Sequence, residues 1–245
     1  MSGHSKWSNI KRKKEKTDAQ KAKVFTKIGR EIGVSVKEGG ADPNSNARLR
    51  DLIAKAKGMN VPNDNINRII KRAEGGEKDD YESIQYEGYG PSGVAVLVGT
   101  LTDNRNRTAA SMRHYFDKFG GNMGQSGSVA FMFSQKGIIL VEGHGVDDEK
   151  LMEDCFDAGA DDFDSSDGIF EITTEPSKVH EVARVLREKA YEVVSDEVEY
   201  IPASYTALSD SDDLKKMAKL LDAMEEDGDV QDVWHNLENE EDLNR

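Results

Sequence analysis

The chain has 245 residues, of which 36% are hydrophobic and 33% charged, and its formal net charge at pH 7 is -14. This composition is poor in apolar residues for one large core, so it favours several small domains. No apolar stretch approaches the roughly 18 residues of a membrane span, and we expect neither a secretory signal peptide nor a membrane partner. The single cysteine, Cys155, excludes an internal disulfide framework and a multi-thiolate zinc site and is typical of a cytoplasmic protein.

The charges are segregated along the chain. Residues 1–80 carry 19 Lys/Arg and 11 Asp/Glu, a net +8, whereas residues 81–245 carry 14 and 36, a net -22. Neutralisation of phosphates by Lys and Arg dominates affinity for nucleic acids, and like charge opposes it. The pattern therefore predicts a basic segment that contacts nucleic acid and an acidic remainder that does not. The alternative is a solvated, self-repelling tail, which is the more usual role of a charge run.

Three helices are predicted in the basic segment. Residues 17–20 (TDAQ) have the spacing of a capping box, and apolar residues then recur at helical period until Gly39 and Gly40 end the helix. A second helix ends near Gly58, and a third begins at Pro62. Because short amphipathic helices cannot bury their apolar faces alone, we expect a three-helix bundle over residues 17–76. The basic arm, residues 1–16, has no apolar stripe and is expected to stay mobile until a partner orders it.

The acidic segment reads as strands and helices. Residues 81–87 and 94–101 predict a hairpin, which is followed by a helix at 107–119 and a strand at 129–133. Residues 137–200 then give strand, helix, strand, strand, helix and strand, the ferredoxin-like βαββαβ order. A last helix at 210–226 and strand at 230–237 cannot close a sheet alone, so we expect them to complete the unit begun at Tyr81.

The predicted fold class is α+β: an N-terminal three-helix bundle followed by two α/β sandwich-type domains, the last ferredoxin-like and inserted in the second. Residues 1–80 form the basic arm and helical bundle. A discontinuous α/β domain takes residues 81–134 and 203–245, and the inserted ferredoxin-like βαββαβ domain takes residues 135–202.

Several stretches resemble those of a known protein family. The chain opens with MSGHSKWSNIKRKK, and further matching stretches are GGADP (39–43), NVP (60–62) with DNI (64–66), YEGYGPSG (86–93), TDN (102–104) with RT (107–108), GSV (127–129) with Phe131, and DVQDV (229–233) with HN (235–236). Two positions depart from the family: it often has a proline where this chain has Ala41, and an aromatic of another type is common at Trp234. In these stretches, which are distributed over nearly the whole length, the chain is similar to the YebC/PmpR family.

The resemblance implies a helical bundle and two α/β domains, with the third, ferredoxin-like domain inserted in the second, and it implies a cytoplasmic protein. Most members of the family are named probable transcriptional regulators with DNA binding. Relatives that include a mitochondrial translational activator of cytochrome oxidase are tied instead to the ribosome and to relief of stalling on proline-rich sequences. The resemblance leaves both targets open.

Candidate nucleic-acid-binding residues lie in the basic arm, in the first helix and at the start of the helix predicted at 107–119. The arm combines cations with a ring that can stack on an exposed base, which suits single-stranded or irregular RNA better than a duplex groove. Trp7 can instead dock the arm on the bundle. Arg105 and Arg107 stand at a helix start, where N–H groups also attract anions, and their alternative role is to pair with neighbouring acids. The candidates are His4, Lys6, Trp7, Lys11, Arg12, Lys13, Lys14, Lys16, Lys21, Lys23, Lys27, Arg30, Arg105 and Arg107.

No pattern predicts catalysis, a cofactor or a metal. The aspartates within 157–167 match no calcium loop, and the glycines within 120–127 lack the Gly-Lys-Ser/Thr of a phosphate-binding loop. No helix-turn-helix signature stands out either. Sequence-specific binding to DNA is therefore less expected than contact with RNA or the ribosome.

We therefore predict a non-enzymatic, nucleic-acid-binding regulator of gene expression. It is either a DNA-binding transcriptional regulator or a ribosome-associated translation factor that binds ribosomal RNA. A third class is an acidic protein-interaction module whose arm only adds solubility. The sequence predicts no oligomeric state.

Overall fold

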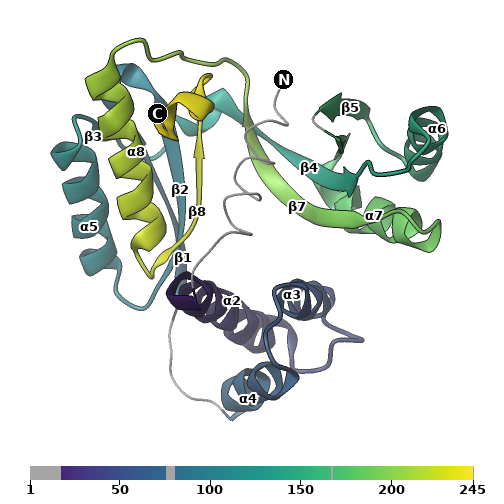
Figure 1. Ribbon diagram of the computed structural model, residues 1–245. Coiled ribbons are helices and arrows are strands. Elements are labelled where there is room, and N and C mark those ends of the chain that lie inside the picture. Colours follow the sequence, from purple (N-terminus) through teal and green to yellow (C-terminus); the bar gives the residue numbers. More distant parts are fainter. Residues whose placement is uncertain (1–17, 76–80, 167, 245) are drawn as a thin grey trace.

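The computed structural model describes residues 18–75, 81–166 and 168–244, with the backbone alone at 18–23 and 244 (Figure 1). The first residue of the capping box at 17–20 and the basic arm therefore lie outside the described residues. The described residues form a mixed α and β fold with N-terminal helices and two four-stranded antiparallel sheets. This arrangement confirms the predicted fold class.

The three N-terminal helices pack into one bundle. Their bounds are α2 Asp18–Gly39, α3 Ala47–Gly58 and α4 Asn63–Glu74. Their apolar stripes meet in a single cluster that includes Leu49 and Ile66. Asn46 fixes the connection between α2 and α3, because its side-chain oxygen accepts a hydrogen bond from the Leu49 N–H at 3.0 Å while its Nδ2 donates to the carbonyls of Ser35 and Gly40, each at 2.8 Å. The bundle thus has its own core and a capped connection.

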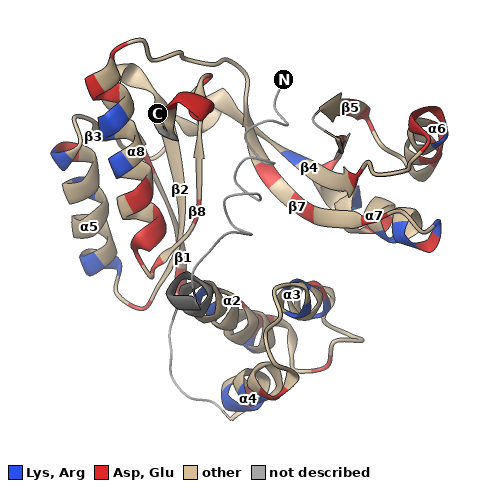
Figure 2. Cartoon of the chain, in the orientation of Figure 1, with Lys and Arg blue, Asp and Glu red and all other residues tan. Residues whose placement is uncertain are grey.

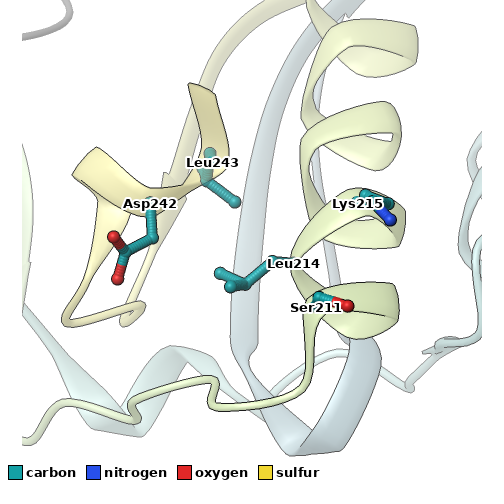
Figure 3. Close-up of a pocket in the computed structure, with 5 residues that line it drawn as sticks. All are labelled: Ser211, Leu214, Lys215, Asp242 and Leu243. Atoms are coloured by element: carbon teal, nitrogen blue, oxygen red, sulfur yellow. The ribbon is translucent and has the colours of Figure 1, made fainter. Parts of the chain in front are cut away.

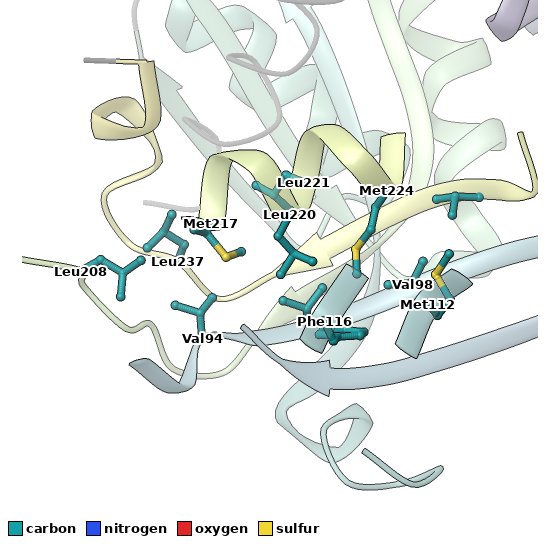
Figure 4. Close-up of a cluster of buried hydrophobic side chains, with 12 residues drawn as sticks. Val94, Val98, Met112, Phe116, Leu208, Met217, Leu220, Leu221, Met224 and Leu237 are labelled. Carbon is teal, nitrogen blue, oxygen red and sulfur yellow. The ribbon is translucent and has the colours of Figure 1, made fainter. Parts of the chain in front are cut away.

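The first sheet, sheet A, has the strand order β3-β1-β2-β8. Its strands are β1 Glu82–Tyr89, β2 Ala95–Thr102, β3 Asn122–Met123 and β8 Val230–His235, and its helices are α5 Arg105–Lys118 and α8 Ser211–Glu226. Both helices lie on one face, where Phe116 of α5 and Leu220 of α8 pack against alternate β2 residues such as Val96 and Val98 (Figure 4). Apolar side chains at every second residue of β2 and at helical spacing in α8 point to this shared core.

The second sheet, sheet B, has the order β5-β6-β4-β7 with every pair antiparallel. Its strands are β4 Phe133–Glu142, β5 Asp162–Ser166, β6 Ile169–Thr174 and β7 Val193–Pro202, and its helices are α6 Asp148–Ala158 and α7 Val179–Glu188. This is the ferredoxin-like arrangement predicted from the element order. Both helices cover one face, and Cys155 of α6 is buried there. Because β8 joins sheet A only after β7, sheet B lies within the chain that forms sheet A.

The strand predicted at residues 129–133 is wrong. A short 3-10 helix, Ala130–Met132, occupies most of this segment, and β4 begins only at Phe133. The backbone N–H groups of Val129 and Ala130 both donate to the Glu87 carboxylate at 2.8 Å. These donors are consequently not available for a strand pairing, although the residue types favour a strand.

Candidate nucleic-acid interface

The predicted site residues are only partly described. The candidates of the basic arm lie outside the described residues, as do the side chains of Lys21 and Lys23 in α2. Their role in binding stays a prediction. Among the fourteen candidates, the structure gives side-chain surroundings for Lys27, Arg30, Arg105 and Arg107.

Helix α4 carries a basic face that the sequence prediction missed. Arg68, Lys71 and Arg72 are charged residues of this helix, and their spacing of three and four residues places them on the same side of it. Asn67 is exposed beside them, while Ile66 points into the bundle core. The apolar residues of this segment recur at a regular helical period, and that regularity could have located the basic face from the sequence.

Helix α3 extends the basic surface of the bundle. Lys57 is exposed in the last turn of α3, and the short connection that follows it leads to α4. Figure 2 shows basic residues on both helices, whereas acidic residues are frequent on α6 and α8. The charge segregation of the sequence is therefore also a segregation in space. A basic surface of this kind attracts a polyanion to the bundle and away from the acidic helices.

Arg107 is held by acids of its own chain. Its Nη2 lies 2.6 Å from Asp229 Oδ2 and 2.8 Å from Asp103 Oδ1. The buried Asp229 carboxylate also accepts hydrogen bonds from the hydroxyls of Thr102 at 3.1 Å and Thr108 at 2.9 Å. Burial raises the pKa of Asp229, but the hydrogen bonds from Arg107 and the two threonines outweigh it, so the pKa lies below its ordinary value. Arg107 therefore pairs with acids of its own chain, which is the alternative to phosphate binding that the sequence analysis left open for it.

Arg105 and the two α2 cations differ in their surroundings. Arg105 is exposed in the first turn of α5, where the Asn104 side chain caps the helix. Lys27 donates to the Glu225 carbonyl at 3.0 Å, and Arg30 Nη1 donates to the Gly228 carbonyl at 2.6 Å. The hydrogen bond of Lys27 joins α2 to the last turn of α8, and that of Arg30 joins α2 to the turn between α8 and β8.

The described residues offer little that supports catalysis. Among them, no group of three or more His, Cys, Asp and Glu side chains is placed to hold a metal ion. A pocket of about 150 Å³ lies between α8 and the C-terminal 3-10 helix at Glu240–Asn244 (Figure 3). Its lining is Ser211, Leu214, Lys215, Asp242 and Leu243. This volume is below that of usual ligand sites, roughly 300–1,000 Å³.

None of the described helices has both the length and the apolar character of a membrane span.

Comparisons with known proteins cover nearly the whole chain. Residues 5–76 match the model of the TACO1/YebC protein N-terminal domain, and residues 81–237 match that of the TACO1/YebC second and third domain. A relative from Finegoldia magna, named "Probable transcriptional regulatory protein", is 53% identical over 241 residues, which are 98% of this chain and 100% of that protein. One of the same name from Ruminiclostridium cellulolyticum is 54% identical over 244 residues, 98% of each chain.

A solved structure has the same fold. The crystal structure of a conserved hypothetical protein from Aquifex aeolicus is similar with a TM-score of 0.82 and 41% sequence identity, and the match covers 91% of this chain and 92% of that one.

Proposed function

Because the chain belongs to the TACO1/YebC family, whose relatives are named probable transcriptional regulatory proteins, we propose that it is a non-enzymatic transcriptional regulator that binds DNA in the cytoplasm. The observation that carries the proposal is the basic face of α4, with Arg68, Lys71 and Arg72 on one side of the helix. Lys57 and the basic arm add further charge to the same part of the chain.

The shape of this surface favours duplex DNA over duplex RNA. The major groove of B-form DNA admits an α-helix, whereas that of A-form RNA is too deep and narrow for protein side chains to read the bases. In the proposed complex the three cations of α4 contact phosphates, which sets position and most of the affinity. Asn67 lies on the same exposed face, and a side-chain amide can pair with adenine in the major groove.

The test measures binding of the intact protein to a fluorescent DNA duplex at several salt concentrations. The variant Arg68→Gln/Lys71→Gln/Arg72→Gln removes the basic face, and the matched control Lys215→Gln/Lys216→Gln/Lys219→Gln removes equal charge from α8. We expect the α4 variant to bind about tenfold more weakly near 0.1 M salt, with a salt slope reduced by about 0.9 for each phosphate that is no longer neutralised. The α8 control should keep nearly the affinity and the salt slope of the unchanged protein.

Two results would contradict the proposal. Equal losses in the α4 variant and the α8 control would show that binding follows net charge alone. Absence of binding at about 0.15 M salt, with competitor DNA present, would favour the third class, an acidic protein-interaction module that does not bind nucleic acid.

The alternative is a translation factor on ribosomal RNA, and the arm favours it, because Trp7 stands among cations that suit unpaired RNA. Sedimentation of a cell lysate separates the two targets. Co-migration with ribosomal particles that resists DNase, and that is lost when Lys11, Arg12, Lys13 and Lys14 are changed to Ala, would establish the translation factor. Promoter DNA recovered by crosslinking, with the protein at the top of the gradient, would establish the transcriptional regulator.

A further inference from the structure

The helical bundle is joined to the two sheets by charged contacts. On the side of sheet A, Arg30 Nη1 lies 3.0 Å from Asp229 Oδ1. On the side of sheet B, Lys55 Nζ of α3 lies 2.6 Å from Glu197 Oε1 of β7. The ring of His180 on α7 lies 3.8 Å from Asp51 Oδ2, one turn before Lys55. Two cations and one carboxylate of the bundle are thus held by the rest of the chain.

The same junction contains little apolar contact. The cluster that forms the bundle core draws its described members from the bundle alone, and the described clusters of sheets A and B include no bundle residue. An interface built from charges and lacking a shared apolar core is weak and sensitive to salt. Relative motion of the joined units is then the default expectation.

The cations at the junction form one surface of the bundle. Lys27 and Arg30 are three residues apart on α2, so they lie on the same side of that helix. Glu31 lies four residues after Lys27 on this side of α2, and α3, which carries Lys55, packs against α2 in the bundle core. Lys55 pairs with Glu197 of β7, and Arg30 pairs with Asp229, which directly precedes β8. Residues of both sheet-forming parts therefore supply negative charge to these cations of the bundle.

We propose that this surface, formed by Lys27, Arg30 and Lys55, is a second phosphate-binding surface that the acidic part of the chain covers in the closed molecule. The carboxylates of Glu197 and Asp229 occupy the places of nucleic-acid phosphates. A DNA duplex that binds the α4 face competes with them, the bundle separates from the sheets, and the three cations add to the interface. The inference rests on the proposed function, because it extends the DNA interface from α4 to α2 and α3.

Competition of this kind is physically reasonable. A carboxylate and a phosphate oxygen accept the same hydrogen bonds from Lys and Arg, and Arg pairs with either in a bidentate manner. Binding to the duplex also releases condensed counterions, whereas exchange among the protein's own charges does not. The DNA therefore gains more from these cations at low salt than the acidic strands do.

One variant releases the covered surface. Glu197→Gln removes the carboxylate partner of Lys55, and the control Glu188→Gln removes an exposed carboxylate that pairs with Arg184 on the same helix, with the same change in net charge. If the surface is covered, Glu197→Gln binds the duplex several-fold more tightly than Glu188→Gln and steepens its salt slope by up to about 0.9. Equal affinity of the two variants would overturn the inference.

A crosslink tests the opposite direction. The variant Asp51→Cys/His180→Cys places thiols on α3 and α7, and a short bis-maleimide then holds the bundle closed. The closed protein should bind the duplex several-fold more weakly than the same variant treated with a mono-maleimide, a control that also covers reaction at the buried Cys155. Unchanged binding after crosslinking would overturn this inference and leave the α4 proposal intact. Absence of binding by every form, including the unmodified chain, would overturn both.

Discussion

The Glu87 carboxylate is buried and accepts three backbone hydrogen bonds, from Gly127 at 2.7 Å and from Val129 and Ala130 at 2.8 Å. Burial raises its pKa, but the three N–H groups together lower it by more, so the pKa lies below the ordinary value. Two of the three donors, Val129 and Ala130, come from the segment in which the sequence predicts a strand. One side chain of β1 thus fixes the path of the chain between β3 and β4.

Glu87→Gln should destabilise the protein by about 2–3 kcal/mol, because an amide NH₂ replaces one acceptor and leaves buried N–H groups without a partner. Urea unfolding at pH 7 measures the change, with the exposed Glu82→Gln as control. Because the folded pKa is depressed, the charge of Glu87 contributes stability above its ordinary pKa of 4.5, and this contribution is lost as pH falls through the folded value. The difference in unfolding free energy between the unchanged protein and Glu87→Gln should therefore become smaller in acid. If the unchanged protein and Glu87→Gln unfolded at the same urea concentration at pH 7, this role of Glu87 would be contradicted.

Residue-level chemistry was the hardest part to predict from sequence. The exposed side of α4 follows from its helical period, and the buried state of Cys155 follows from its place beside Leu151. The partners of Arg30 and Arg107 lie 199 and 122 residues away, and no local pattern encodes such pairs. For the same reason the hydrogen bonds from residues 127–130 to Glu87 were not foreseen.

At the scale of elements, periodicity predicted most of the fold. The glycines at 39–40 and near 58 and 75 coincide with the ends of α2, α3 and α4, and the βαββαβ order of sheet B follows from alternating periods of 2 and 3.6. The two-residue strand β3 was not predicted, because it is too short to carry a pattern. The element order also suggested that α8 and β8 return to sheet A, since short elements must bury their apolar faces against a neighbour.

Helix α7 contacts α3 through a titratable side chain. His180 Nδ1 lies 3.0 Å from Asp196 Oδ2, while Asp51 approaches its Nε2 from the bundle. The hydrogen bond with Asp196 raises the pKa of His180, burial lowers it, and Asp51 raises it again, while the nearby Arg187 lowers it, so the net direction is upward from 6.5. The protonated ring therefore strengthens the contact between α3 and α7.

An NMR titration should give His180 a midpoint above 6.5, and Asp196→Asn should lower the midpoint more than Asp51→Asn does. Because the folded pKa is raised, the stabilisation is fully present below pH 6.5 and is lost as pH rises through the folded value. The difference in unfolding free energy between the unchanged protein and His180→Gln should thus be about 0.5 kcal/mol near pH ~6 and smaller near pH ~8.5. A midpoint at or below 6.5 would contradict this role of His180.

The whole molecule combines a basic bundle with an acidic pair of sheets. Each of the three parts has its own apolar core, and the bundle meets the sheets through Arg30, Lys55 and His180. Stability is therefore distributed unevenly: strong cohesion lies within each part, and weaker, charge-based cohesion joins the bundle to the others. The same arrangement lets the bundle move without loss of its own fold.

Thermal unfolding of the intact chain should therefore occur in more than one step, with the small bundle melting before the sheets. Its core is the smaller one, and the sheets support it mainly through charged side chains. Hydrogen exchange checks the assignment, because amides near Ile32 and Leu49 should open at a lower free energy than those near Val96 and Ile139. Raising salt from about 0.1 to about 1 M should screen the charged junction and separate the steps further. One cooperative transition, with equal protection in all three cores, would show that the junction is as cohesive as the cores it joins.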